Sequence, residues 1–406
     1  MSFIPRLPAA VSLVLAACLA AGSRVPADDF RYVEPAGGFV SVDQLKFSLE
    51  AVLGGLEYLP DGRLVTYDTL SGEIRVEGSS TPLASFASKP FGSFIVLAPG
   101  AESVYFGESS NGEIYRVPLD GTAPVLADRI SYNFDLAFDP SGRGFVSAPG
   151  LAGGNSIRLL DEDPAVESRE VVVRLPGYSG PVAVDATGDL YYGTSDGASL
   201  EGQKVFRYRR DLLDLALAGQ PLEPGDEELV FDELPGIYSL KLLGGRLLFT
   251  DLGFSAGLGA LHAAQLGETA PLETLATFHA PSGLCSPSFL AVRSGKAAFE
   301  PGSGLAGGSV AIAYSDFTTV SRVAVIRPEL HFVRGRVNSD AVVDLSDAIS
   351  ILTFLFSGGA APEVPEAADL NGDGILDLSD AVYLLDFLFR GGPAIPAPFP
   401  EPGPAP

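Results

Sequence analysis

The chain has 406 residues, of which 51 are acidic and 26 basic, so its formal net charge is −25 at neutral pH. This charge argues against binding to nucleic acid or to anionic membrane surfaces, because like charges repel. The length allows one large and one small domain.

A signal peptide is predicted over residues 1–27, where a charged start precedes an apolar stretch too short to span a bilayer comfortably. Cleavage after Gly22 or Ala27 would satisfy the small-residue rule. Residues 15–18 also resemble a bacterial lipobox, in which Cys18 would be lipidated and anchor the protein to the cell surface. Both alternatives predict an exported protein.

Cysteine usage supports the same view. The chain contains only Cys18 and Cys285, so a mature chain has at most one free cysteine and no internal disulfide. Stability must then come from packing. No segment after the amino terminus reads as a membrane span, because Gly, Pro or charged residues interrupt every apolar run.

Residues 28–330 contain short strand-like segments separated by Gly, Pro, Asp and Ser. A recurring unit has an apolar strand, a tight turn, a second apolar or aromatic strand and, after a polar gap, a third strand. Six copies at spacings of about forty to sixty residues predict a β-propeller, because one four-stranded blade cannot bury both its faces alone. The copies include residues 56–67, 94–106, 136–146, 182–192, 240–249 and 290–299.

Two of these units carry the Asp-x-x-Gly turn of the pattern apolar-Asp-x-x-Gly-apolar, at residues 139–142 and 185–188. In this they resemble blades of six-bladed propellers of the NHL and lactonase/strictosidine-synthase type. The resemblance implies a mainly β fold with six blades. The alternative is a seven-bladed ring that uses the stretch 39–47, and residues 317–326 are expected to close the last blade.

Lactonases of this shape place Glu, Asn and Asp metal ligands at the mouth of the central channel. Here Gly180 stands where the resemblance implies a carboxylate. Glu57, Asn133 and Asp135 lie near the starts of inner strands and are expected to face the channel. We therefore predict channel-lining polar groups and no catalytic residue.

Three other features carry no predicted chemistry. Residues 253–257 match a hydrolase nucleophile motif but lie in a Gly-rich loop, whereas the motif needs a strand, a sharp turn and a helix. Residues 302–307 match a dinucleotide fingerprint without the helix that must follow. His262, His279 and His331 show no metal-ligand spacing. The absence of Trp weakens, without excluding, a carbohydrate cleft.

Residues 369–380 fit a twelve-residue EF-hand-type calcium loop. Gly374 permits the left-handed turn between its halves. The apolar run that follows predicts one helix, starting on the last ligand and ending at Gly391. No matching helix is expected before the loop, because Pro365 interrupts that segment. The predicted calcium ligands are Asp369, Asn371, Asp373, the Ile375 carbonyl, Asp377 and Asp380.

This loop-helix unit occurs twice. Residues 345–349 repeat as 378–382, and residues 354–359 repeat as 387–392, roughly 33 residues apart. Duplication, ligand spacing and paired helices resemble the type I dockerin domain, the calcium-dependent module that binds cohesin domains. The resemblance covers residues 331–392 and implies a small all-α domain with Ca²⁺ as its cofactor.

The first copy, residues 336–347, departs from the pattern. Arg336 replaces the first carboxylate, and Ala341 replaces the turn glycine. A cation in the first ligand position repels the metal, and Ala at positive φ is strained. We predict weak calcium binding or none here. The ligands of this loop would be Asn338, Asp340, the Val342 carbonyl, Asp344 and Asp347.

Dockerin recognition of cohesin usually rests on a hydroxyl pair in each loop and a basic pair on each helix. The loop pairs here are Leu-Ser at 345–346 and 378–379, and the helix pairs are Leu-Thr at 352–353 and Leu-Asp at 385–386. These departures argue against a standard cellulosomal partner. The two near-identical faces leave a symmetric, two-way docking mode open.

The tail, residues 393–406, is Pro-rich and is expected to be extended or disordered. Phe399 is the residue that would anchor it if it folded back on the preceding module.

Together these features predict an exported calcium-binding protein. Its propeller binds a protein partner or glycan, and its dockerin-like module attaches it to a larger extracellular complex through a cohesin-like domain or another protein. The alternative is a propeller hydrolase, lactonase-like or polysaccharide-acting, tethered in the same way.

Overall fold

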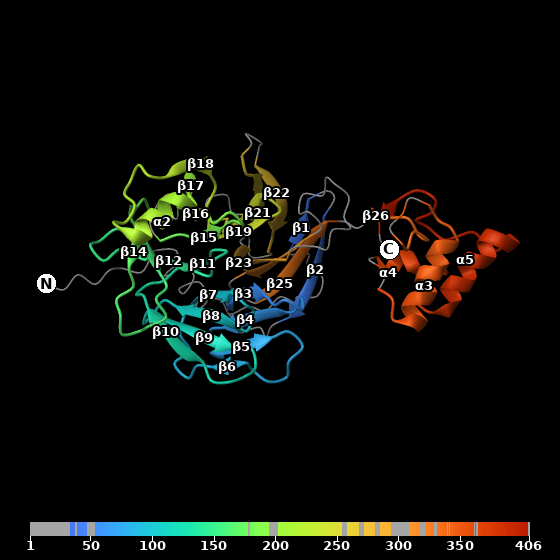
Figure 1. Ribbon diagram of the computed structural model, residues 1–406, viewed down its shortest axis with the longest axis horizontal. Coiled ribbons are helices and arrows are strands. Elements are labelled where there is room, and N and C mark those ends of the chain that lie inside the picture. Colours follow the sequence, from blue (N-terminus) through green and yellow to red (C-terminus); the bar gives the residue numbers. More distant parts are fainter. Residues whose placement is uncertain are drawn as a thin grey trace. The chain divides into compact units, whose positions relative to one another are not determined.

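The chain divides into two compact units. One comprises residues 1–294 and 308–327, and the other comprises residues 295–307 and 328–406 (Figure 1). We call them the propeller and the carboxy-terminal module. The computed structural model describes residues 33–36, 39–46, 53–177, 179–194, 202–253, 258–267, 272–280, 285–293, 308–316, 321–328, 331–338, 340, 342–360, 362 and 364–404.

Six antiparallel sheets form the propeller, and each is one blade. The prediction of six blades is confirmed. From the inner strand outward, blades one to three are β3 (Leu53–Tyr58), β4 (Leu64–Asp68), β5 (Glu73–Val76) and β6 (Ala84–Ser85); β7 (Gly92–Leu97), β8 (Ser103–Glu108), β9 (Glu113–Pro118) and β10 (Val125–Arg129); and β11 (Asp135–Phe138), β12 (Gly144–Pro149), β13 (Asn155–Leu159) and β14 (Glu170–Leu175).

The remaining blades follow the same order, except that two strands from the amino terminus join them. In blade five, β1 (Val33–Pro35) adds a fifth, outermost strand, and in blade six β2 (Phe39–Lys46) is the outermost strand. The others are β15 (Val182–Val184), β16 (Leu190–Gly193), β17 (Gln203–Tyr208) and β18 (Glu228–Leu234); β19 (Ser239–Leu243), β20 (Arg246–Asp251), β21 (Gly259–Gln265) and β22 (Glu273–Phe278); and β23 (Ser286–Arg293), β24 (Ser309–Ser315) and β25 (Ser321–Pro328).

The inner strands form a closed ring around a central channel. Each contacts the inner strand of the next blade, and β23 contacts β3 in return (Figure 1). The pairing of β2 with β25 ties the amino-terminal strand to the last blade. The seven-bladed alternative is therefore wrong, because the stretch 39–47 supplies a strand to blade six and no blade of its own.

Two other expectations for blade six are corrected. Residues 317–326 do not end the blade, since β25 is its third strand and β2 lies outside it. The second strand, expected within 290–299, is β24, and residues 294–299 lie outside the described residues. Neither pairing follows from a local hairpin, which is why sequence spacing did not predict it.

The recurring Asp and Gly of the blade pattern form the turn between the first two strands. Asp139 accepts hydrogen bonds from the main-chain N–H groups of Ser141 and Arg143, both at 2.9 Å. Gly142 adopts the left-handed φ of +89° that such a turn requires. The pattern is thus explained by turn chemistry.

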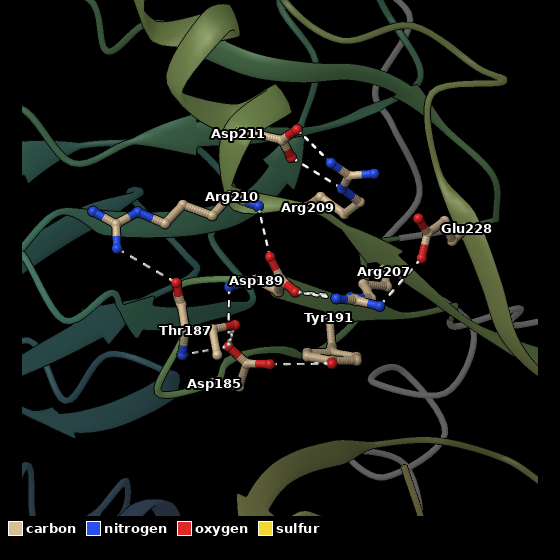
Figure 2. A network of polar contacts seen from close by, with 9 residues as sticks. All are labelled: Asp185, Thr187, Asp189, Tyr191, Arg207, Arg209, Arg210, Asp211 and Glu228. Carbon is tan, nitrogen blue, oxygen red and sulfur yellow. Dashed lines mark hydrogen bonds and ion pairs between the residues drawn. The ribbon is translucent and has the colours of Figure 1, made fainter. Parts of the chain in front are cut away.

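Figure 2 shows the corresponding turn of blade four. Asp185 accepts hydrogen bonds from the N–H of Thr187 at 2.8 Å and from the hydroxyl of Tyr191 at 3.2 Å. Asp189 accepts from Arg207 Nε at 2.9 Å and from the N–H of Arg210 at 2.7 Å (Figure 2). These bonds hold strand β17 and the start of a helix against the turn.

That helix, α2 (Arg210–Ala218), was not predicted from the sequence. It follows β17 and buries Leu213 and Ala216 among side chains of blades three and four. Core side chains elsewhere fill the spaces between neighbouring blades: the rings of Tyr67 and Phe106, from blades one and two, lie 4.3 Å apart. Burial of apolar area between blades is the main force that closes the ring.

The carboxy-terminal module packs together two copies of one loop-helix unit. Helices α3 (Leu345–Ser357) and α5 (Leu378–Arg390) contact each other and bury Ala348, Ile351, Ala381 and Leu384. A two-stranded sheet pairs β26 (His331–Phe332) with β27 (Gly403–Pro404). None of the described helices is long and apolar enough to cross a membrane.

Helix ends in the module differ slightly from expectation. Helix α5 begins at Leu378, two residues before the predicted start, because Asp377 caps it. It ends as predicted before Gly391, which has a φ of +66°. A short helix, α4 (Pro365–Ala368), precedes the second loop: Pro365 begins this turn at a position where its missing N–H costs nothing.

Residues 393–404 of the tail contain no helix and end in the two-residue strand β27, so they fit the extended form that the sequence predicts. Ile395 is buried in the core of the module. Phe399 packs edge-on against Phe387, with ring centroids 5.5 Å apart. The fold-back anchored on Phe399 is therefore confirmed.

Burial of His262 predicts a pH dependence of stability. This side chain stacks on Phe249 at 5.2 Å, and burial lowers its pKa from 6.5 to about 4. Between these pH values the unfolded chain binds a proton that the folded chain does not. The free energy of unfolding should therefore fall by up to about 3 kcal/mol as the pH drops from 6.5 to 4.

Chemical denaturation of wild type and His262→Phe at pH 7.5 and 5 measures this effect. The wild type should lose more stability than the variant on acidification, since Phe does not titrate, whereas carboxylates titrate equally in both. Equal losses would show that His262 is protonated in the folded protein.

Candidate functional site

The second loop of the carboxy-terminal module is folded around the carboxylate of Asp369. This carboxylate accepts hydrogen bonds from the main-chain N–H groups of Gly372 at 2.8 Å, Asp373 at 3.1 Å and Gly374 at 3.2 Å. Gly374 has a φ of +81°, which the loop needs to turn back. The chain therefore forms a tight turn with its first acidic side chain inside.

Asp380 ties the two ends of the loop together. One of its oxygens accepts from the N–H of Leu370 at 2.8 Å, and the other accepts from the N–H of Asp377 at 2.9 Å. The residue is fully buried, and this burial raises the pKa of Asp380, while the main-chain hydrogen bonds oppose the shift. A carboxylate held this way fixes the loop to helix α5.

The other predicted ligands lie between these two residues. Asn371 Nδ2 donates to Asp373 Oδ2 at 2.9 Å, and the N–H of Ile375 donates to Asp373 Oδ1 at 2.8 Å. Asp377 caps α5 by accepting from the N–H of Ser379 at 2.7 Å. Within the described residues, no three His, Cys, Asp or Glu side chains converge as a metal-holding group. The ligand assignment stays a prediction.

The first loop has the same hydrogen-bond frame. Asp347 accepts from the N–H of Val337 at 2.6 Å and from that of Asp344 at 2.9 Å. Asp340 accepts from the N–H of Val342 at 2.8 Å and from Asn338 Nδ2 at 2.9 Å. All of these residues except Val337 are predicted ligands of this loop, and they occupy the positions of their counterparts in the second loop.

What the first loop lacks is the central carboxylate. Arg336, at the position of Asp369, is exposed to solvent. Ala341, at the position of the turn glycine, lies outside the described residues. The fold of the two loops is therefore shared, whereas the acidic centre belongs to the second loop alone.

Sequence analysis missed Arg334, which connects the second loop to the tail. Its guanidinium is buried and lies 3.4 Å from a carboxylate oxygen of Asp369. It also donates to the main-chain carbonyls of Glu366 at 3.2 Å and Ala397 at 3.1 Å. Its own N–H donates to the carbonyl of Pro398 at 2.6 Å. The partners are distant in sequence, so no local pattern could have revealed them.

The two copies also carry a repeated apolar stripe. Its eight residues are 45% to 68% exposed, although all are large and hydrophobic. On α3, residues 345, 349 and 356 lie on one face by helical spacing, and residues 378, 382 and 389 do the same on α5. The stripe consists of Val342, Leu345, Ile349 and Phe356 in the first copy, and of Ile375, Leu378, Val382 and Phe389 in the second.

In the propeller, the inner strands of three alternate blades carry charged side chains. Glu57 is on β3, Asp135 on β11 and Lys241 on β19, which are inner strands of blades one, three and five. Burial raises the pKa of both acids, and the charge of Lys241 opposes the shift in each. Because these blades are not neighbours, groups that interact from all three must face the channel.

The prediction that Glu57 and Asp135 face the channel agrees with this arrangement, whereas that for Asn133 does not. The Asn133 side chain is buried and donates to the main-chain carbonyls of Glu108 at 2.9 Å and Ile130 at 3.1 Å. Its amide oxygen accepts from the Ser93 hydroxyl. Asn133 is a structural residue that joins two blades.

The features set aside at the sequence level remain without a chemical role. His262 is buried, His279 is hydrogen-bonded to Thr277 at 3.0 Å, and His331 belongs to β26. Most of the 253–257 motif, all of the 302–307 motif, and the amino-terminal segment with Cys18 lie outside the described residues. Cys285 is buried.

Comparisons with known proteins assign no family to this chain. The sequence matches no protein-family model and no curated protein. Three solved structures are similar in fold at low sequence identity. A luciferin-regenerating enzyme is 14% identical with a TM-score of 0.49, covering 71% of this chain and 95% of that protein.

A protein described as a gluconolactonase is 12% identical with a TM-score of 0.47, covering 72% of this chain and 93% of the other. Virginiamycin B lyase from Staphylococcus aureus is 10% identical with a TM-score of 0.46, covering 71% and 99%. At this identity the similarities concern the propeller fold and assign no activity to this chain.

Arg334 should be essential for the stability of the module. Arg334→Met removes the side-chain donor of the main-chain carbonyls of Glu366, Asp369 and Ala397 and the ion-pair partner of the Asp369 carboxylate, at a cost of about 3 kcal/mol. Thermal unfolding of the full-length protein followed by calorimetry resolves this loss.

Arg336→Met is the matched control, because that side chain is exposed. A change at such a surface position should stay within about 0.5 kcal/mol. If both variants unfolded at the wild-type temperature, the contacts of Arg334 would not contribute to stability.

Proposed function

We propose that this is an exported calcium-binding protein whose carboxy-terminal module attaches it to a larger extracellular complex. The propeller has a binding site of its own. The module would be dockerin-like and its partner a cohesin-like domain or another protein. The observation that carries the proposal is the second loop, which is folded around the carboxylate of Asp369. The first copy keeps the same loop fold but lacks this central carboxylate. Export rests on the predicted signal peptide.

The residues of the second loop fit a calcium ion. A hard cation takes six to eight oxygen ligands, and alternate residues of a tight loop can supply them. Residues 369–380 offer four carboxylates, one side-chain amide and main-chain carbonyls, with no basic residue among them. Calcium would neutralise this negative charge and hold the start of α5 to the rest of the module.

Arg334 also fits this role. It contacts one carboxylate oxygen of Asp369 and the main-chain carbonyl of the same residue. These contacts hold the first predicted ligand in place from the side of the tail. The chain therefore positions Asp369 before any metal is bound, which reduces the ordering cost of binding.

The repeated apolar stripe supports docking as the purpose of the module. Large apolar side chains exposed side by side on a soluble protein mark an interaction surface more often than chance. Burying Phe356 or Phe389 against a partner would contribute about 1.5–3 kcal/mol each. Both copies present Leu and Phe at two of the four stripe positions and exchange Val and Ile at the other two, so a partner can bind either helix in a similar way.

The alternative, a tethered propeller hydrolase, is favoured by one observation. Burial raises the pKa of Glu57 and Asp135 in the same channel, and a pair of perturbed acids is a common arrangement for acid-base catalysis. Assays with lactones and polysaccharides test this directly.

Calcium binding should be confined to the second loop. Calorimetric titration of the full-length protein should show one tight site, and Asp373→Ala should weaken it at least about tenfold by removing a ligand. At about a hundred times the Kd, calcium should raise the free energy of unfolding of the module by about 2.7 kcal/mol.

Asp340→Ala makes the same change at the equivalent position of the first loop, so it should leave the tight site intact. Two equally tight sites in the wild type, or an unchanged titration for Asp373→Ala, would contradict the calcium assignment.

Docking should depend on the stripe in either copy. Immobilised wild-type protein should retain a partner from the extracellular fraction of producing cells in calcium and release it in a chelator. Phe356→Asp and Phe389→Asp should each retain that partner, since the other face remains, while the double variant should lose it.

Leu272→Asp, an exposed apolar residue in the propeller, is the control and should bind as the wild type does. Retention by the double variant would place the docking surface elsewhere.

A further inference from the structure

We propose that the tail is a calcium-responsive strap, connected to the second loop through Arg334. Docking of the tail on the module tightens calcium binding, and bound calcium in turn holds the tail in place. This inference rests on the calcium site proposed above and adds a conformational response to it. It concerns the carboxy-terminal module alone and does not depend on the docking partner.

The tail is attached to the rest of the module by a small set of contacts. Ile395 is buried in the core, and the ring of Phe399 packs edge-on against that of Phe387. The carbonyl of Ala394 accepts from the Tyr383 hydroxyl at 2.9 Å, and β27 pairs with β26. Among residues 393–403, Ile395 alone is buried. A segment with so few buried apolar contacts can be released by local opening while the helices stay packed.

The Arg334 side chain joins this tail to the second loop. Its Nε donates to the carbonyl of Ala397 at 3.1 Å. At the other end of the same group, a terminal nitrogen lies 3.4 Å from a carboxylate oxygen of Asp369 and donates to the carbonyl of that residue. The guanidinium is planar and rigid. When the tail leaves, it loses its acceptor at Nε and is free to turn away from Asp369.

A second contact brings the tail against the loop itself. A β-carbon placed on Gly372 would lie 3.7 Å from Cγ of Pro396, so the proline ring lies over this glycine. The N–H of Gly372 donates to Asp369 at 2.8 Å. The tail therefore packs against the main chain that surrounds the first predicted ligand.

The connection serves the loop that keeps its central acid. Arg334 precedes the first loop in the sequence, but its carboxylate partner belongs to the second loop. By the repeat, residue 334 corresponds to Ala367, whose side chain cannot donate to a carboxylate. The tail is therefore placed to respond to the state of the second loop.

Docking of the tail should favour calcium, although Arg334 is a cation. The second loop carries four carboxylates, so a bound calcium ion still meets an excess of negative charge. Arg334 fixes Asp369 before the metal binds, and an ordered ligand costs less entropy on binding. The coupling is reciprocal: if the docked tail raises the calcium affinity about tenfold, calcium favours the docked tail by the same factor.

The test begins with calorimetric titration of calcium into the full-length protein. Deletion of residues 393–406, or the milder Phe399→Ala, should weaken binding at the second loop at least about tenfold. Glu401→Gln is the matched control, because Glu401 is exposed in the same tail, and it should bind as the wild type does. Circular dichroism shows that α3 and α5 remain folded in each variant.

A double-mutant cycle tests the route through Arg334. Combining Arg334→Met with Phe399→Ala should weaken calcium binding at least about threefold less than the product of the two single losses. Arg336→Met with Phe399→Ala is the control pair and should show no such shortfall, since Arg336 is exposed. A merely structural role would lower thermal stability without this coupling in calcium affinity.

The reciprocal effect can be measured without a destabilising change. The chain contains no Trp, so Phe399→Trp places a single fluorophore at the anchor of the tail. Calcium should reduce the quenching of its fluorescence by acrylamide, because calcium holds the tail in place. Adding Asp373→Ala, which removes a predicted ligand, should abolish this effect of calcium.

Three results would overturn the proposal: wild-type calcium affinity in folded Phe399→Ala, a double variant whose loss equals the product of the single losses, or quenching that calcium leaves unchanged. Each of them would leave the calcium site itself intact. A wild type that binds no calcium would overturn both this inference and the calcium assignment.

Discussion

One interaction recurs throughout this acidic protein: an aspartate side chain accepts hydrogen bonds from main-chain N–H groups a few residues further along. It shapes the blade turns at Asp139 and Asp185 and the second loop of the carboxy-terminal module at Asp369. Hydrogen bonds to a charged acceptor contribute about 1.5–3 kcal/mol where they are sheltered from water. Many of the carboxylates therefore have a structural role, because they accept hydrogen bonds in turns that neutral side chains would stabilise less well.

The same interaction explains how protonation of these groups is controlled. Partial burial raises the pKa of Asp139, yet hydrogen bonds from Ser141 and Arg143 more than offset it and leave the pKa below its ordinary value. Asp135 lies in the channel, where burial dominates and the pKa is raised. The number of donors around a carboxylate, relative to its burial, decides the direction in which its pKa shifts.

Local sequence patterns predicted what depends on local contacts. The Asp-x-x-Gly pattern predicted the positions of blade turns. The ligand spacing and the Gly after each helix predicted the positions of both loop-helix units. The outermost strand of blade six, the contact of Arg334 with Asp369 and the position of Lys241 opposite Glu57 depend on segments far apart in the sequence. No local pattern encodes such pairings, and helix α2 was missed because nothing in the blade pattern calls for it.

The two loop-helix units show which parts of a duplicated structure are independent of the metal. The first copy keeps its capping Asp344, its buried Asp347 and the left-handed Gly358 after its helix, although Arg336 stands where the central acid would be. Packing of α3 against α5 and the capping hydrogen bonds suffice to maintain its shape. The first unit can therefore serve as a scaffold for the second.

The partnership of β2 with β25 has a consequence for biosynthesis. These strands are separated by almost the whole propeller, so the ring cannot be sealed until the ribosome has made the last blade. Until then β25 presents an open edge, which is prone to pairing with other chains. The nascent protein must keep its first strand unengaged for hundreds of residues, and this late step, with its long loop to close, is where assembly of the ring should be slowest.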